Sequence, residues 1–397
     1  MGDAGTGGGG GSDGGTLMDA GACTMGETRC DGDNLLTCAS SGTWQVTNCY
    51  VACVPDAPAR CGTLRPSNLP ADVCATAGTA DLAPTTATTA LSTDTCTAIV
   101  PQTGGPDVCV MVYGKITIPR GTTVRITSGA TRRVAALVGL AEVTIDGVID
   151  VGGRGGADGA GGGYAPAGPG TGGSNMASSR AGGGGGGFGT PGQAGNDYQA
   201  AGAAGGALYG KPELVPLLAG SRGGGVIPGG AGGGLALVGC RGITLKAGAV
   251  LDASGGGGGG FQQSLATVGG GGGGSGGALL IETGNLTVES GAILVANGGG
   301  GASGNLTDHD GAGGADGPRS TSQASGGAPG YPTAGAGGLG GSSTAPPTAG
   351  GFSGHSQSGG GGGGGAEGRI RVNVRSGMTF SGATVSPSAS LGQAPIN

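Results

Sequence analysis

Aromatic residues, histidine and charged residues are all scarce in this chain of 397 residues. It has 4 Phe, 6 Tyr, 1 Trp and 2 His, and only 11% of its residues are charged. A core built on large rings is therefore excluded, and so is a site that needs several histidines. Basic residues are scattered and the net charge is −6, which argues against a nucleic-acid-binding surface. We expect no nucleic-acid partner and no cofactor.

The sequence also lacks a long hydrophobic run. No stretch of about 20 apolar residues is present, so no transmembrane segment is predicted, and no secretory leader is visible. A membrane anchor such as a lipid would have to lie in a segment outside this chain. Residues 1–19 are rich in glycine and are expected to form a flexible tether.

Glycine is abundant, with 106 residues. Such a composition is typical of disorder, but a motif that recurs five times argues against disorder throughout. Each copy reads apolar-Thr-apolar, then Gly and an apolar stretch. The central threonines are Thr117, Thr144, Thr244, Thr287 and Thr379. This recurrence predicts a repeat architecture.

Apolar residues alternate with period two on both sides of each threonine, which indicates β-strands. The residues expected to align before the threonine are Val108 and Val110, Ala135 and Leu137, Leu235 and Leu237, Ala278 and Leu280, and Ile370 and Val372. Those expected to align after it include Val124, Ile149, Leu251 and Leu294. We predict an all-β fold, a parallel β-helix or β-solenoid of about five rungs over residues 108–387. Its aliphatic side chains would stack about 4.8 Å apart.

Glycine-rich insertions interrupt this solenoid at residues 152–234, 254–277 and 298–367. They lack the strict Gly-X-Y period of collagen. One alternative is a set of floppy loops, because loop closure costs little free energy. The other is a set of extended segments resembling polyglycine II, hydrogen-bonded side by side. We favour the second alternative.

Nine of the ten cysteines precede residue 110. Six of them lie in residues 20–62, a segment too short for an independent core without cross-links: Cys23, Cys30, Cys38, Cys49, Cys53 and Cys61. We predict a small disulfide-rich module there, with the pairing left open. Zinc is the alternative, but the segment has no histidine and no CxxC. Disulfides favour an extracellular or cell-surface location.

Residues 63–107 are predicted to cap the open end of the solenoid, and residues 388–397 to form a C-terminal tail. Among the remaining cysteines we predict a Cys96–Cys109 bridge, which leaves Cys74 and Cys240 to pair or stay free. A Cys109–Cys240 bridge does not fit, because the two lie at different register positions two rungs apart.

The best catalytic candidates are Asp150 and Asp252, which occupy equivalent positions after the motif glycine, where Arg125 stands in the first repeat. Stacked on a solvent-facing sheet, two carboxylates could act as the acid and base of a polysaccharide-cleaving β-helix. The alternative, which we favour, is a structural ion pair between Arg125 and Asp150.

Two further groups of residues have a functional interpretation. Asp308, His309 and Asp310 are consecutive residues of the kinds that bind metals, although a polar loop tip is the favoured interpretation. Trp44 and Tyr50 could stack on a sugar ring, although a Trp in a small disulfide module is more often part of its core.

Four stretches carry a resemblance to known proteins. They are the six-cysteine run with Trp44 (Cys30-Asp-Gly, Leu36-Thr-Cys38, Gly42-Thr-Trp44, Cys49), Ile116-Thr-Ile-Pro, Leu237-Val-Gly-Cys240-Arg-Gly and Gly365-Ala-Glu-Gly-Arg369-Ile-Arg371-Val. On these residues the chain resembles glycine-rich secreted or surface proteins of myxobacteria and related predatory bacteria. The resemblance implies a location and a shape rather than a chemistry.

These observations predict a non-enzymatic extracellular protein with a structural or adhesive role. Its expected partner is a cell-surface or matrix polysaccharide, or another copy of the chain. The alternative is a carbohydrate-binding or carbohydrate-active β-helix that uses Asp150 and Asp252.

Overall fold

The computed structural model describes residues 23–76, 80–164, 170–174, 179–261 and 266–397. The tether expected over residues 1–19 lies outside these ranges. The chain divides into two compact units, Met1–Gly62 and Thr63–Asn397. Both are built from β-strands, and the only helical segment among the described residues is the short 3-10 helix η1 (Val73–Ala75).

The first unit is a small antiparallel module held by three disulfides. Its strands are β1 (Thr28–Asp31), β2 (Asn34–Cys38), β3 (Trp44–Asn48), β4 (Cys53–Val54) and β5 (Arg60–Cys61), with β2 between β1 and β3 and with β4 paired to β5. The disulfides are Cys23–Cys38, Cys30–Cys53 and Cys49–Cys61. They replace the large apolar core that so short a segment cannot supply.

The second unit contains three sheets, and in each of them consecutive repeats supply neighbouring parallel strands. The seven-stranded sheet contains β7 (Ala98–Val100), β8 (Val108–Tyr113), β11 (Val134–Gly139), β14 (Gly234–Gly239), β17 (Ala278–Thr283), β20 (Arg369–Val374) and β23 (Ser390–Gln393). The five-stranded sheet contains β9 (Ile116–Ile118), β12 (Glu142–Ile145), β15 (Gly242–Leu245), β18 (Leu286–Val288) and β21 (Met378–Phe380). The six-stranded sheet contains β6 (Thr88–Ser92), β10 (Thr123–Thr127), β13 (Val148–Asp150), β16 (Val250–Asp252), β19 (Ile293–Val295) and β22 (Thr384–Ser386).

The predicted all-β fold with parallel sheets is confirmed. In the five-stranded sheet, the five motif threonines lie beside one another in register, from Thr117 to Thr379. The aliphatic residues that flank the first four threonines point the opposite way and are buried in a common core, whereas Met378 beside Thr379 is exposed. After the threonine, Val124, Ile149, Leu251 and Leu294 pair as predicted.

The predicted alignment before the threonine is wrong for the first and fourth repeats. Ala135 pairs with Cys109 rather than with Val108, and Leu235 pairs with Leu279 rather than with Ala278. Counted between paired positions, two residues separate the strands in these repeats (Tyr113 to Ile116, and Thr283 to Leu286), whereas three separate them in the others, as from Gly139 to Val143. A slip of one residue reverses every side chain of a strand, so the core there receives the other alternate set.

Residues 63–107 contribute to the second unit in three places, one of which is β7, paired antiparallel with β8. The β6 strand pairs with β10, and Leu82 forms a bridge to Ile116, so this part lies beside the first repeat. Ser67 instead lies against the seven-stranded sheet, where its backbone N–H and its hydroxyl donate hydrogen bonds to Glu282. Strand β23, from the expected tail, pairs with β20.

Two disulfides attach this segment to the sheets. Cys96 is bonded to Cys109 in β8, and Cys74 in η1 is bonded to Cys240, directly after β14. All ten cysteines of the chain are disulfide-bonded, and none is free.

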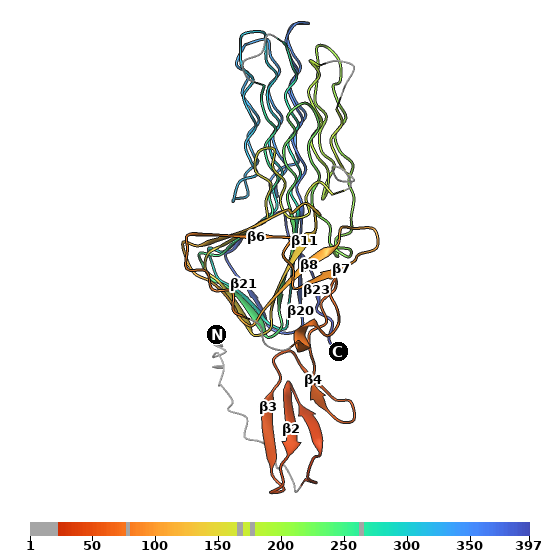
Figure 1. The fold of residues 1–397 in the computed structure, drawn as a ribbon, viewed down its shortest axis with the longest axis vertical. Coiled ribbons are helices and arrows are strands. Elements are labelled where there is room, and N and C mark those ends of the chain that lie inside the picture. The colour runs from red at the N-terminus through yellow and green to blue at the C-terminus, as the bar shows by residue number, and fades with distance from the viewer. Residues whose placement is uncertain (1–22, 77–79, 165–169, 175–178, 262–265) are drawn as a thin grey trace, which may run out of the picture. The chain divides into compact units, whose positions relative to one another are not determined.

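The glycine-rich segments leave the three sheets as long extended chains that run side by side (Figure 1). We call the described residues of these insertions the glycine bundle. Its backbone hydrogen bonds join distant parts of the sequence: the N–H of Gly273 donates to Gly363, and the N–H of Gly363 donates to Gly183. Both glycines are buried. A β-carbon on Gly273 would collide with a backbone oxygen of a neighbouring chain, so this close packing requires glycine.

Candidate functional site

Asp150 and Asp252 lie beside each other in the six-stranded sheet, in register with Arg125. This column is the one that the sequence predicts. The prediction that it faces solvent is wrong, because Asp150 is only 4% exposed and Asp252 is 0% exposed. The insertions fold over this part of the sheet and bury both carboxylates.

Three arginines surround the two carboxylates. Arg125 donates to Asp150 at 2.7 Å. Arg154 donates to Asp150 at 3.0 Å and to Asp252 at 2.6 Å. Arg319, from the third insertion, donates to Asp252 at 2.8 Å and to Asp150 at 3.3 Å. We call these five residues the Arg–Asp cluster.

The charges of the Arg–Asp cluster stabilise one another. Burial alone would raise the pKa of Asp252, but Arg154 and Arg319 outweigh burial and lower it below its usual value. Burial alone would lower the pKa of Arg154, but Asp252 and Asp150 raise it. Asp252 and Arg154 are therefore held in their charged forms. The arrangement attaches two insertions to the sheet, as a structural ion-pair network does, and general acid–base chemistry by either aspartate would first require breaking these contacts.

The Asp308-His309-Asp310 segment lies in a turn closed by a bridge between Leu306 and His309. The ring of His309 stacks on Tyr331, with 4.6 Å between ring centroids. Within the described ranges, no group of three or more His, Cys, Asp or Glu side chains is placed to hold a metal ion. The structure therefore does not bring this trio together as a metal site.

Trp44 and Tyr50 do not form a joint platform. Trp44 begins β3, and Tyr50 lies two residues beyond the other end of that strand. The guanidinium of Arg29 lies 4.5 Å from the centroid of the Trp44 ring and covers one of its faces. Tyr50 is 56% exposed.

The end of the glycine bundle remote from the sheets is a second feature that the sequence analysis did not predict. Asn305 accepts a hydrogen bond from Gly359 and donates one to Val268, and all three residues lie about ten positions from the nearest strand. At about 3.1 Å per residue in an extended polyglycine chain, they are roughly 30 Å from the sheets.

Aromatic rings gather at this remote end. Tyr198 forms a bridge to Ser353, which follows Phe352, and Phe352 is 59% exposed. His309 and Tyr331, whose rings stack, also lie here. His309 follows Asn305 closely in the sequence, and Tyr331 shortly precedes Gly335, whose N–H donates to Gly359. We call Tyr198, His309, Tyr331 and Phe352 the bundle end.

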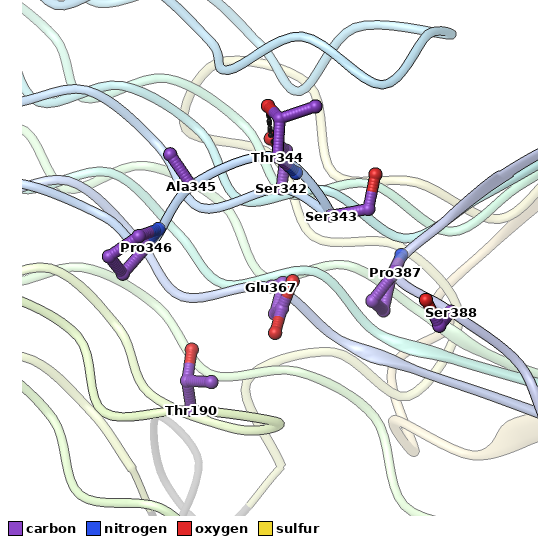
Figure 2. Close-up of a pocket in the computed structure, with 9 residues that line it drawn as sticks. All are labelled: Thr190, Ser342, Ser343, Thr344, Ala345, Pro346, Glu367, Pro387 and Ser388. Atoms are coloured by element: carbon purple, nitrogen blue, oxygen red, sulfur yellow. Dashed lines mark hydrogen bonds between the residues drawn. The ribbon is translucent and has the colours of Figure 1, made fainter.

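A cavity of about 430 Å³ lies at the other end of the bundle, next to the sheets (Figure 2). Four separate segments line it, and they supply Thr190, Ser342 and Ser343, Glu367, and Ser388. Figure 2 shows the side chain of Glu367 in the middle of the other lining residues. We call this cavity the Glu367 pocket.

Two polar groups of the Glu367 pocket lack protein partners within the described part of the chain. The hydroxyl oxygen of Thr190 is buried and has no hydrogen-bond partner. No hydrogen bond or ion pair joins the Glu367 carboxylate to a described residue. Burial raises the pKa of Glu367, against an opposing effect of Arg369. No sequence pattern indicates that these residues lie together, because their proximity depends on the path of the insertions.

Comparison with family models, curated proteins and solved structures finds no match to this chain. In the ranges that the structure describes, no helix is long and apolar enough to cross a membrane. The five disulfides are consistent with an extracellular protein.

Proposed function

We propose that the chain is a non-enzymatic extracellular or cell-surface protein with a structural or adhesive role. In this proposal the three parallel sheets form the faces of a β-solenoid, and the glycine bundle is a polyglycine-II-like spacer that projects from it. The in-register threonines and the common aliphatic core support the solenoid. The five disulfides support an oxidising location.

One observation carries the adhesive role. A hydrogen-bonded bundle of glycine backbone holds exposed aromatic rings roughly 30 Å from the sheets. Large exposed rings are unfavourable in water unless they meet a partner, and rings are also the side chains that pack on the faces of other rings. A stiff spacer keeps them away from the body of the protein. The partner class we propose is a cell-surface or matrix polysaccharide.

The test is binding of the purified protein to immobilised matrix polysaccharide. The double variant Tyr198→Ser, Phe352→Ser is expected to lose most of this binding. Leu208→Ser is the control, because Leu208 is 54% exposed and lies next to Tyr209, whose carbonyl oxygen accepts a hydrogen bond from Arg369 at the start of β20. Undiminished binding by the double variant would remove the bundle end from the proposal. Unchanged adhesion of cells that lack the protein would remove the adhesive role.

The proposed location has its own test. Protein isolated from its producing cells in the presence of a thiol-alkylating reagent should carry no alkylated cysteine, because all ten cysteines are paired. Recovery of the alkylated, reduced form would contradict an oxidising compartment.

A further inference from the structure

The Glu367 pocket has the volume of a small-molecule site. Its volume of about 430 Å³ lies within the range of such sites, roughly 300–1,000 Å³. Its walls come from segments that are far apart in the sequence, from Thr190 in the first insertion to Ser388 after β22. The fold therefore assembles this cavity only when the insertions are in place.

The unpartnered, buried hydroxyl of Thr190 indicates that something polar completes the site. Buried polar atoms in folded proteins nearly always have a hydrogen-bond partner, and an exception calls for water, an ion or a ligand. The Thr190 hydroxyl can both donate and accept a hydrogen bond, whereas an ionised Glu367 carboxylate can only accept. A ligand that satisfies both must supply several hydrogen-bond donors.

The rest of the lining narrows the ligand class. All the polar side chains that line the pocket, apart from Glu367, are Ser or Thr. None of the lining residues is cationic, so an anionic ligand would be repelled by Glu367. Pro346 and Pro387 add apolar surface on opposite sides of Glu367 (Figure 2). A polyhydroxyl ring with C–H faces matches this mixture, since its hydroxyls both donate and accept.

We propose that the Glu367 pocket binds an uncharged sugar residue, whose hydroxyls donate to Glu367 and exchange hydrogen bonds with Thr190 and the neighbouring serines. This site is separate from the bundle end and does not depend on an adhesive role.

The ionised Glu367 carboxylate destabilises the folded protein. Because burial raises its pKa above the value in the unfolded chain, the charged form is less favourable in the folded protein at neutral pH. Replacing it by a neutral isostere is therefore expected to leave the protein folded. This makes Glu367→Gln a usable probe of ligand binding rather than of folding.

The experiment titrates the purified full chain with glucose, galactose, N-acetylglucosamine and maltose, and with methylamine as a small cation. We expect at least one of the sugars to bind saturably, and Glu367→Gln and Thr190→Val each to weaken it about ten-fold or more, the effect of losing one strong hydrogen bond. Glu289→Gln is the matched control, because Glu289, directly after β18, pairs with Lys246, directly after β15, outside the pocket. Its affinity should equal that of the natural sequence.

Three results would overturn the proposal. They are no saturable binding of any sugar, binding of methylamine but of no sugar, and unchanged affinity in both pocket variants. Saturation-transfer NMR on the unmodified protein decides the first two even if a variant fails to fold. Because the bundle-end variant Phe352→Ser leaves the pocket residues intact, failure of polysaccharide adhesion and failure of sugar binding can be told apart.

Discussion

A β-carbon added to Gly273 would collide with the carbonyl oxygen of Gly299, which belongs to a neighbouring chain of the glycine bundle. The backbone of Gly273 is also hydrogen-bonded on both sides, to Gly363 and to Gly186. The chains cannot separate to admit a methyl group without breaking these bonds. We expect Gly273→Ala to lower the free energy of unfolding by about 1–3 kcal/mol, as overpacking does in other interiors.

The matched control for this prediction is Gly313→Ala in the same bundle. There the nearest atom to an added β-carbon lies 3.4 Å away, an ordinary van der Waals contact. Alanine also reduces the conformational entropy of the unfolded chain, so Gly313→Ala should be neutral or slightly stabilising. Equal melting temperatures for the two variants would mean that the bundle is not close-packed.

The charge on Asp252 is a second single-residue feature with a measurable effect. Asp252→Asn removes one of the two buried carboxylates that Arg154 and Arg319 contact, and breaking a buried pair is strongly destabilising. Because both arginines are partly exposed, we expect a loss of up to about 3 kcal/mol in chemical denaturation. Asp146→Asn is the control: Asp146 pairs with the well-exposed Arg120, and such surface pairs contribute about 0–1 kcal/mol. A loss no larger than that of the control would contradict the role of the cluster.

The same carboxylate predicts how stability depends on pH. The pKa of Asp252 is lower in the folded protein than in the unfolded chain, so its ionised form stabilises the fold at pH values above the ordinary carboxyl pKa, near 4. This contribution is lost as the pH falls through the lower, folded-state pKa. The melting temperature of the natural sequence should therefore fall more steeply below pH 4 than that of Asp252→Asn. Parallel curves for the two proteins would contradict this assignment.

Among the structural elements, the segment around η1 depends on one covalent link. The Cys74–Cys240 disulfide joins positions 166 residues apart, whereas Cys96–Cys109 joins positions only 13 apart. In the loop-entropy description, a cross-link that closes a longer loop stabilises more, by about 2 kcal/mol for this difference. We expect the double variant Cys74→Ser, Cys240→Ser to lose more stability than Cys96→Ser, Cys109→Ser.

Hydrogen exchange gives the matching local measurement. Without the Cys74–Cys240 link, amides of residues 63–76 should exchange faster, while the buried strand β14 keeps its protection. Loss of protection throughout the sheets would show instead that the link supports the whole unit.

The strands could be predicted from the sequence because their information is local. An apolar residue on each side of Thr117 or Thr144 specifies a strand, its inward face and its register, since a shift of one residue would bury the threonine. The sequence pattern did not reveal, however, that Cys109 and Leu279 take the inward positions that were predicted for Val108 and Ala278. Between paired positions, the link from Tyr113 to Ile116 is one residue shorter than the link from Gly139 to Val143, and the length of a link leaves no periodic signal.

The sites in the insertions could not be predicted in this way. Arg154 and Arg319 contact the aspartates, and Thr190 lies near Glu367, because the neighbouring glycine backbones pack in one particular alignment along their length. Those contacts are hydrogen bonds between N–H and C=O groups, which every residue carries. A run of identical glycines therefore does not encode which chain it lies beside. The aspartate column itself was predictable, but its burial was not.

At the scale of the second unit as a whole, the glycine bundle and the three sheets are expected to unfold together. The Arg–Asp cluster attaches the first and third insertions to the six-stranded sheet. The backbone also joins them near the sheets, because the N–H of Ala366 donates to Gly186 and the N–H of Gly276 donates to Ala366. At this junction the glycine bundle and the sheets share the same contacts, so neither can open without breaking contacts of the other.

Native-state hydrogen exchange of the glycine amides tests this coupling directly. The amides of Gly272, Gly273 and Gly363 are buried and hydrogen-bonded, so they should exchange only through the opening that also exposes β14 and β17. Their opening free energies should therefore match those of the core strands and fall equally in Gly273→Ala. Exchange at the rate of an unstructured chain would show that the glycine segments are mobile loops, in which case a rigid spacer for the bundle end would no longer exist.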